Sequence, residues 1–142
     1  MIDELTYKVR GCIFEVFREL GPGLLESVYE SALVYELLNK GLKVEAQLPL
    51  PVKYKSIQLQ VGLRLDIVVE DCVIIEVKSV GQLHDVHKKQ LLTYLRLTNK
   101  TVGFLVNFNT THLENKESLI RIVNNYSSAD SAISARDQNI SS

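Results

Sequence analysis

The sequence predicts an α/β fold in which a mixed β-sheet is flanked by helices. Apolar residues recur at helical spacing over residues 3–20, 24–39 and 83–98. Residues 61–80 have the alternating pattern of a β-hairpin, and residues 101–108 form a continuous apolar run typical of a buried strand. A helix between two strands of one sheet requires a crossover, which adds the second strand parallel to the first. The sheet should therefore combine antiparallel hairpin strands with a parallel strand.

The remaining segments extend this plan. Residues 42–47 are expected to form a strand, and residues 52–61 a second hairpin that turns at Ser56. Residues 116–126 could form a last strand or a helix. The helix over residues 24–39 is apolar nearly all round, which predicts that it is sandwiched between other elements.

Length and composition indicate one domain. The chain has 142 residues and a formal net charge of −1, so no global basic field points to nucleic acid. Residues 1–126 are assigned to the domain, and the serine-rich residues 127–142 are expected to form a disordered tail. The N-terminus lacks the pattern of a signal peptide, and no apolar run is long enough to span a bilayer. We expect a cytoplasmic protein without a membrane partner.

Three charged residues lie inside the apolar strands of the central hairpin: Asp66, Glu76 and Lys78. Burying a charge in a sheet is costly unless the charge is paired, hydrogen-bonded or bound to a metal. Side chains alternate between the two faces of a strand, so a turn with an odd number of loop residues would place Asp66 opposite Glu76. Arg64 and Lys78 would then share their face. The opposite face would be wholly apolar and would comprise Leu65, Ile67, Val69, Val73, Ile75 and Val77.

Two opposed carboxylates repel each other, unless a divalent cation lies between them. Carboxylate oxygens are the ligands that Mg²⁺ and Mn²⁺ prefer, and Lys78 can reach the same point. The alternative is an edge-strand pair of Glu76 and Lys78 beside a solvated Asp66. The hairpin alone leaves both interpretations open.

The helices carry further candidates. Glu26 and Glu30 lie one turn apart on the second helix. Acidic residues in the first turn interact favourably with the helix dipole, which is enough to explain Glu26 but explains Glu30 less well, because Glu30 lies further into the helix. His84 and His87 have no third soft ligand and are interpreted as surface or core-edge histidines.

The third helix is expected to bury an amide. When Gln90 is placed at the centre of a face, several apolar or aromatic side chains fall within about 60° of it. These are Leu83, Val86, His87, Tyr94 and Leu97. Gln90 is therefore predicted to be a core-facing amide that needs partners. Leu92 and Leu95 would point the other way, toward a homodimer contact or another segment.

Several blocks resemble known nuclease families. Asp66, followed by Glu76-Val77-Lys78, resembles the signature of the PD-(D/E)XK nuclease superfamily. The segment from Gln90 to Tyr94 resembles the Gln-x-x-x-Tyr motif of its RecB-like branch. Residues 20–33, LGPGLLESVYESAL, resemble the opening of the bacterial GxxExxR protein family, although Tyr29 stands where the family name implies Arg. Further blocks of that pattern are Arg64-Leu-Asp66, Ile75-Glu76-Val-Lys78, Gln90-Leu-Leu-x-Tyr94-Leu95 and Val106-Asn107-Phe108.

The resemblance implies a restriction-endonuclease-like αβββαβ core and a metal-dependent nuclease acting on nucleic acid, DNA in preference to RNA. Asp66, Glu76 and the carbonyl of Val77 would bind Mg²⁺ or Mn²⁺. Glu26, or Glu30 in its place, would hold the metal or complete a second site. Catalytic roles would also fall to Lys78, Gln90 and Tyr94. The candidate phosphate contact is Arg64, with Lys53, Lys55, Lys88 and Lys89 as weaker candidates; the four lysines are also explained as solvated surface. The alternative function is a catalytically silent nuclease-like module that binds nucleic acid or protein.

Overall fold

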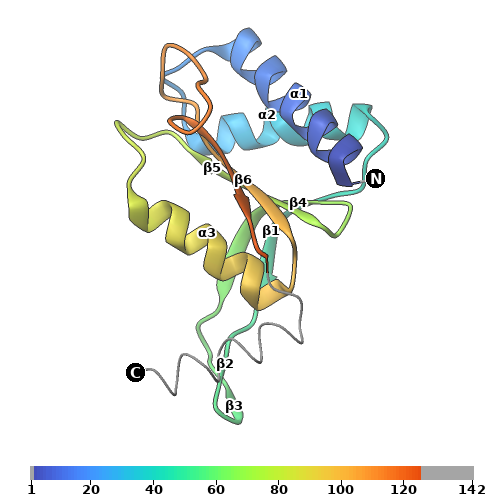
Figure 1. The fold of residues 1–142 in the computed structure, drawn as a ribbon, viewed down its shortest axis with the longest axis vertical. Coiled ribbons are helices and arrows are strands. Elements are labelled where there is room, and N and C mark those ends of the chain that lie inside the picture. Colours follow the sequence, from blue (N-terminus) through green and yellow to red (C-terminus); the bar gives the residue numbers. More distant parts are fainter. Residues whose placement is uncertain (1, 126–142) are drawn as a thin grey trace.

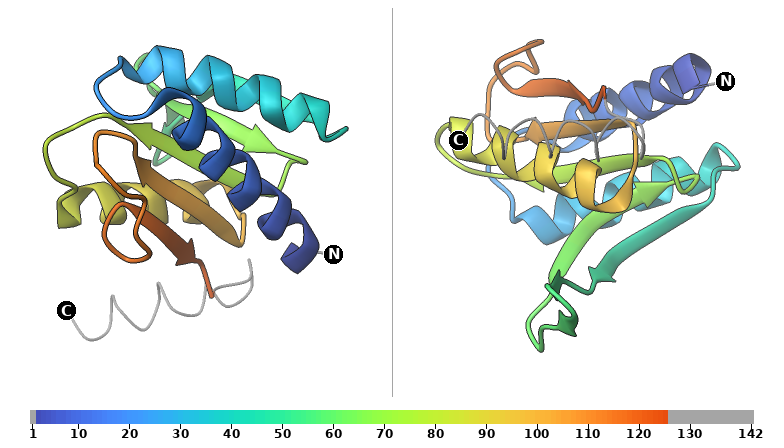
Figure 2. Two further views of the ribbon diagram at one scale, coloured as in Figure 1. Left: turned by 90° about the horizontal axis from the view of Figure 1, so that it is seen from above. Right: turned by 60° about the horizontal axis from the view of Figure 1, so that its bottom comes forward.

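The computed structural model describes residues 2–125, and the predicted tail lies outside this range. A five-stranded sheet with the order β1-β4-β5-β6-β7 lies between helices on its two faces (Figures 1 and 2). The elements are α1 (Ile2–Leu20), α2 (Glu26–Asn39), β1 (Val44–Leu50), β2 (Lys53–Tyr54), β3 (Ile57–Gln58), β4 (Leu63–Val69), β5 (Val73–Lys78), α3 (Asp85–Thr98), β6 (Val102–Asn107) and β7 (Leu119–Val123).

The sheet is mixed, as predicted. β1 and β5 pair antiparallel with β4, and β6 pairs parallel with β5 after the crossover through α3. The segment after residue 116 forms a strand, β7, that pairs antiparallel with β6. The short strands β2 and β3 form a separate hairpin that projects from one end of the sheet (Figure 1).

The helices bury two separate apolar clusters against the sheet. α1 and α2 cover one face through residues such as Ile13 and Leu33, which are fully buried. α3 covers the other face through Leu91 and Leu95. Cys12 and Cys72 are free thiols. No helix within residues 2–125 is long and apolar enough to cross a membrane.

The prediction that α2 is sandwiched is wrong. Three of its side chains, Tyr29, Leu33 and Leu37, are buried against α1 and the sheet. Tyr35 and Leu38 are 63% and 53% exposed. Packing from one side covers one stripe of the helix, so the apolar composition of the other stripe does not indicate a partner.

The predicted orientation of α3 is also wrong. The buried residues are Leu91, Tyr94 and Leu95, at the i, i+3, i+4 spacing of a single stripe, whereas Gln90 is exposed. The true face is therefore centred about 100° from the predicted one. Leu95 is fully buried under the sheet and Leu92 is half-buried, so the homodimer contact predicted through these two residues is not available.

Candidate active site

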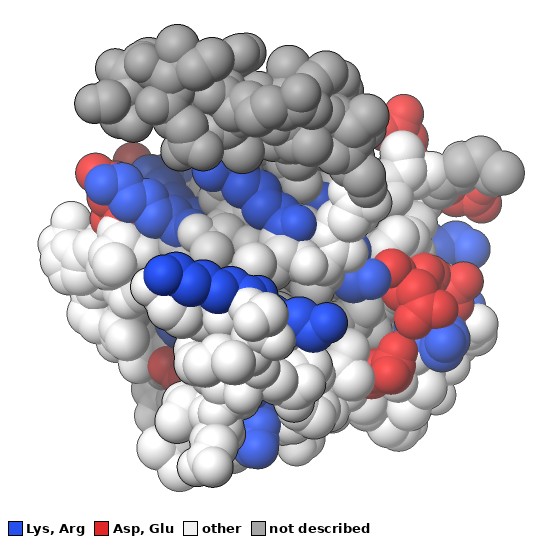
Figure 3. All heavy atoms as spheres, turned by 90° about the horizontal axis from the view of Figure 1, so that it is seen from below, with Lys and Arg blue, Asp and Glu red and all other residues white. Residues whose placement is uncertain are grey.

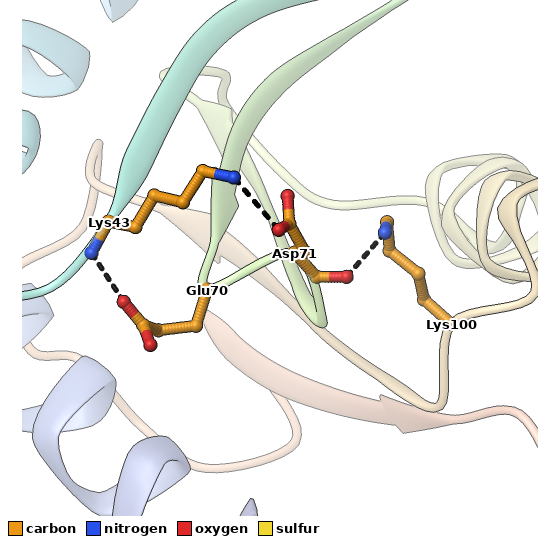
Figure 4. Close-up of polar contacts among 4 residues, drawn as sticks. All are labelled: Lys43, Glu70, Asp71 and Lys100. Atoms are coloured by element: carbon orange, nitrogen blue, oxygen red, sulfur yellow. Dashed lines mark hydrogen bonds and ion pairs between the residues drawn. The ribbon is translucent and has the colours of Figure 1, made fainter.

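The turn between β4 and β5 sets the register of the central hairpin. It has three residues, and Glu70 and Asp71 both adopt left-handed backbone conformations. Figure 4 shows how neighbouring segments hold it. Lys43 donates through its backbone N–H to Glu70 Oε2 at 2.5 Å and through Nζ to Asp71 Oδ2 at 2.9 Å, and Lys100 Nζ donates to the carbonyl of Asp71. The odd loop length places Asp66 opposite Glu76, which confirms the predicted pairing.

The two carboxylates lie where the sheet divides. Backbone pairing of β4 with β5 ends at Ile67 and Ile75. Beyond this point β4 stays with β1, β5 stays with β6, and the two pairs of strands diverge (Figure 2). Beyond this point, carboxylate side chains accept hydrogen bonds from backbone N–H groups of the neighbouring strand. The N–H of Asp66 donates to Glu76 Oε2 at 3.0 Å, and the N–H of Val77 donates to Asp66 Oδ2 at 2.8 Å.

The division of the sheet also changes the orientation of β4. Ile67 packs with the core under α1 and α2, but Leu65 packs with the core under α3. The predicted apolar face that included Leu65 is therefore wrong at this residue, because β4 does not keep strict alternation through Asp66. Arg64 is exposed and lines a hollow of about 460 Å³ beside residues at the base of the β2–β3 hairpin.

Gln47 is part of the site and was not singled out from the sequence. It adopts a φ of 53° and interrupts the pairing of β1 with β4 opposite Asp66. Its Nε2 lies 2.8 Å from both carboxylate oxygens of Glu30, and a hydrogen bond from Gln47 also lowers the pKa of Asp66. Gln47 thus links the acid of α2 to the acid of β4. A polar residue in a half-exposed strand gives no sequence signal for this role.

Tyr29 holds the loop that leads into α2. Its hydroxyl donates to the carbonyl of Gly21 at 2.5 Å and accepts from the N–H of Leu24 at 3.1 Å. Its ring stacks on Phe108, with 4.4 Å between the ring centroids. The residue that departs from the GxxExxR pattern therefore has a structural role, because it holds the loop immediately before Glu26.

Glu26 meets the end of β5. Its Oε2 accepts the N–H of Ser79 at 3.1 Å, and the Ser79 hydroxyl donates to the carbonyl of Leu24 at 2.7 Å. The next residue, Val80, exchanges two hydrogen bonds of 3.0 Å with the buried side chain of Asn107. The segment after Lys78 is therefore held both from α2 and from β6.

Burial gives this cluster unusual electrostatics. Burial, and next the charge of Asp66, raises the pKa of Glu76 to about 8. Burial also raises the pKa of Asp66 and of Glu30; the Val77 N–H, followed by Lys78, opposes the shift at Asp66, and Gln47 opposes it at Glu30. Within residues 2–125, Lys78 forms no close ion pair with either strand carboxylate. The acids are thus short of compensating positive charge.

The α3 side of the site carries a tyrosine–glutamine pair. Tyr94 is 6% exposed, and its hydroxyl accepts from Nε2 of Gln90 at 2.7 Å. Burial raises the pKa of Tyr94, and the charges of Glu76 and Asp66 raise it further. Gln90, although exposed, is thus hydrogen-bonded to a tyrosine that is close enough to the carboxylates for their charges to raise its pKa.

His84 and His87 lie at the N-terminal end of α3, with His84 at the cap position before the helix. The N–H of His84 donates to Nδ1 of His87 at 3.0 Å. This bond satisfies a backbone group at the helix terminus, in agreement with the interpretation of these residues as non-ligands.

The donor chemistry of the cluster fits a hard divalent cation. The carboxylates of Asp66, Glu76, Glu26 and Glu30 and the carbonyl of Val77 offer oxygen ligands only, as Mg²⁺ and Mn²⁺ prefer. In the described part of the chain, no three His, Cys, Asp or Glu side chains are already grouped to hold a metal. The acids bind backbone N–H groups and an amide instead, so a cation would have to displace these neutral donors.

The predicted phosphate contacts are not gathered with the acids. Lys53 and Lys55 are exposed on the projecting β2–β3 hairpin, where Lys55 Nζ lies 5.6 Å from the centroid of the Tyr54 ring. Figure 3 views the molecule from the side of this hairpin and shows lysine and arginine side chains distributed across the face, with acidic side chains concentrated near one edge. Any contact of these lysines with nucleic acid would be peripheral.

A mixed sheet with helices on both faces, divided at an Asp that faces Glu-x-Lys, defines a restriction-endonuclease-like α/β protein. A family model described as the PD-(D/E)XK nuclease superfamily matches residues 3–122, and the chain belongs to this superfamily. Searches of curated proteins and of solved structures find no significant match.

Proposed function

We propose that the protein is a metal-dependent nuclease that hydrolyses phosphodiester bonds of nucleic acid, DNA in preference to RNA. The observation that carries the proposal is the pair of opposed, buried carboxylates of Asp66 and Glu76 at the division of the sheet, in a chain of the PD-(D/E)XK superfamily. Burial disfavours the charged form of these acids, so a proton or a cation has to compensate their charge. Acids of this kind are common at functional sites.

Asp66, Glu76, the carbonyl of Val77 and Glu26 would hold Mg²⁺ or Mn²⁺, and Glu30 would support them through Gln47. When bound, the metal supplies Lewis acidity that polarises the scissile phosphate and lowers the pKa of a bound water. The carboxylates would hold the cation at the end of β5, where the hydrogen bond from the Ser79 N–H to Glu26 fixes the backbone.

Lys78 is assigned two roles: it places or activates the attacking water, and it offsets the negative charge that builds on the phosphate in the transition state. Tyr94, held by Gln90, is assigned to orienting the region of Glu76 and the substrate backbone. Arg64, with Lys53 and Lys55 farther out, is assigned to the phosphates of the bound strand.

The bond between Gln90 and Tyr94 supports placing the chain in the RecB-like branch of the superfamily, because it links the two residues of that motif next to the acids. The blocks around Glu26, Asp66 and Asn107 support membership of the GxxExxR family. The arginine of that family's name has no counterpart here, since Tyr29 is buried in the core.

Cleavage assays test the nuclease proposal. Single- and double-stranded DNA and RNA are incubated with the protein and Mg²⁺, Mn²⁺ or EDTA. We expect cleavage with metal only, and losses of roughly 100-fold or more in Lys78→Ala and Asp66→Asn, as when one group that stabilises transition-state charge is removed. Lys8→Ala, which removes an exposed charge on α1, is the matched control. Absence of cleavage under all conditions, or cleavage unchanged in both site variants, contradicts the proposal.

A catalytically silent module is the second candidate. The observation that favours it is that each of the four acids already accepts a hydrogen bond from a neutral donor. A silent module would bind the same oligonucleotides without cleaving them, and its affinity would not depend on Asp66.

A further inference from the structure

A second hollow lies at the β7 edge of the sheet, separate from the acids. Its volume is about 480 Å³. Four of the residues that line it are basic: Arg10, Lys88, Lys116 and Arg121. The others that line it are Asn115, Leu119 and Ile120.

The basic side chains converge from three separate parts of the chain. Arg10 comes from α1 and Lys88 from α3, which cover opposite faces of the sheet, and β7 lies at its edge between them (Figure 2). Lys116 lies in the loop before β7, where its backbone N–H is tied to the carbonyl of Leu119 at 3.0 Å. Arg121 lies on β7 itself and is exposed. The positive charge of the hollow therefore comes from the fold, which brings separated basic residues together, and not from a basic run in the sequence.

The charges around this hollow are poorly compensated within the protein. No acidic side chain lines it in the described residues. Arg10 donates to the neutral amide oxygen of Asn115 at 2.8 Å, and Lys88 reaches only the solvent-exposed Asp85, at 3.7 Å. A concave surface lined by charges of one sign focuses the electric field and concentrates counter-ions. In a chain with a net charge of −1, this hollow is a local concentration of positive charge suited to an anion.

The hollow lies at the same end of the sheet as Lys78. Lys78 is in register with Asn107 at the end of β6, and Leu119 at the start of β7 pairs with Val106, the residue before Asn107. Two strand spacings separate β5 from β7, which is ~10 Å. At the ~3.4 Å of axial rise per nucleotide in a DNA duplex, this distance corresponds to about three nucleotides of one duplex strand.

We propose that this hollow binds the phosphodiester backbone of the nucleic-acid strand, about three nucleotides from the bond that is cleaved. The inference rests on the proposed function, because it takes the acids at the end of β5 as the point of cleavage. It assigns the chain a site for substrate backbone that contacts neither the metal nor the reacting phosphate. The site should therefore contribute affinity for longer strands and leave the chemical step unchanged.

The test measures binding separately from cleavage. A fluorescently labelled single-stranded DNA of about 12 nucleotides is titrated in EDTA, over a series of salt concentrations, and anisotropy is recorded. The double variant Lys116→Ala/Arg121→Ala removes two exposed side chains, so the fold should be kept. Its matched control, Lys8→Ala/Arg18→Ala, removes the same net charge from α1 outside the hollow.

We expect the hollow variant to weaken binding about tenfold and to reduce the slope of log affinity against log salt by about 1.4, since each phosphate contact to a single strand contributes roughly 0.7. The control variant should change both quantities much less. An equal loss in both double variants would show an effect of net charge and would overturn the inference.

The failures of the two proposals are distinguishable. Unchanged binding by the hollow variant, together with metal-dependent cleavage by the wild type, overturns this inference and keeps the nuclease. A specific loss of binding without any cleavage by the wild type keeps the hollow as a backbone site and rejects the nuclease. If the wild type neither binds nor cleaves nucleic acid, both proposals are rejected.

Discussion

Glu76 is the residue in which the structural and functional demands on this site conflict. It is 5% exposed, faces another carboxylate, and accepts a hydrogen bond from the backbone of Asp66. Burial is the main reason that its pKa is raised to about 8. Without a metal, the folded protein therefore keeps a proton on Glu76 at neutral pH, and this proton takes the place of positive charge.

This shift predicts how stability depends on pH in the absence of metal. Above the ordinary glutamate pKa, the unfolded chain has released the proton that the folded chain still holds. The free energy of unfolding should therefore fall between about pH 4.5 and 8, by up to ~1.4 kcal/mol per unit from this one group, and this contribution should be level above pH 8. Urea unfolding in EDTA from pH 5 to pH 9 measures the slope.

The variant Glu76→Gln should flatten this slope, because the neutral amide has no proton to exchange. It should also be more stable than the wild type at pH 8 without metal. Glu19→Gln, an exposed position on α1, is the matched control and should keep the wild-type slope. If Glu76→Gln unfolds with the wild-type pH dependence, Glu76 does not carry the proton.

Single residues of the site were predictable to different degrees. The pairing of Asp66 with Glu76 followed from the period of two in a strand, which leaves one register that sorts the charges. The position of Leu65 did not follow, because β4 loses strict alternation where the sheet divides. Gln47 gave no signal, since its left-handed backbone and its bonds to Glu30 depend on tertiary contacts.

At the scale of elements, the contact of α3 with the sheet controls how Tyr94 and Gln90 meet the acids. The helix lies close to the sheet at Gly103 of β6. A Cβ at this position would lie 3.0 Å from the carbonyl oxygen of Ile74 and 3.0 Å from Cδ1 of Leu91. The small residue allows Leu91 of α3 to lie close to β6.

Replacement of Gly103 by alanine should displace α3 and destabilise the protein by about 1–3 kcal/mol, the usual cost of overpacking a core. Gly11 is the matched control: it lies in the middle of α1 with open space around its Cα, so Gly11→Ala should stabilise by about 0.5–1 kcal/mol. Urea unfolding curves of the two variants measure these opposite signs. A Gly103→Ala protein as stable as the wild type would show that α3 can move without cost.

The three helices and the strands of the central hairpin were predictable from periodicity, but residues 116–126 left strand and helix open, and the face of α3 was not predictable. Leucines occupy positions 91, 92, 95 and 97, so apolar residues are found on most sides of the helix. Several faces then fit the pattern about equally well, and the amide of Gln90 was placed at the centre of the wrong one. The structure selects the stripe of Leu91 and Leu95 because these side chains meet the sheet.

At the scale of the whole molecule, the site exists because the sheet divides. β4 leaves β5 beyond Ile67, and α2 brings Glu26 and Glu30 to the resulting gap. The order of elements and the sign of the charges were readable from the sequence. The division was not, because it depends on which partner each strand keeps, and such pairing is a non-local property of the fold.

This arrangement predicts a metal-linked gain in stability that does not depend on catalysis. A cation that binds only the folded chain should raise the free energy of unfolding, by about 2.7 kcal/mol when its concentration is 100 times the Kd. The gain from Mg²⁺ or Mn²⁺ should be larger at pH 8 than at pH 6, since Glu76 must lose its proton to bind the metal. Thermal unfolding with and without metal at both pH values measures the gain.

The controls for this measurement separate the site from the rest of the surface. Asp66→Asn should lose the gain, because an amide is a weaker ligand and Asp66 is one of the two strand acids. Glu19→Gln on α1 should keep it. A gain that is equal in the wild type and in Asp66→Asn would place the metal elsewhere on the protein. A complete absence of gain would mean that hydrogen bonds from neutral donors and the proton on Glu76 stabilise the four acids without a metal. The chain would then be a binding module and not a nuclease.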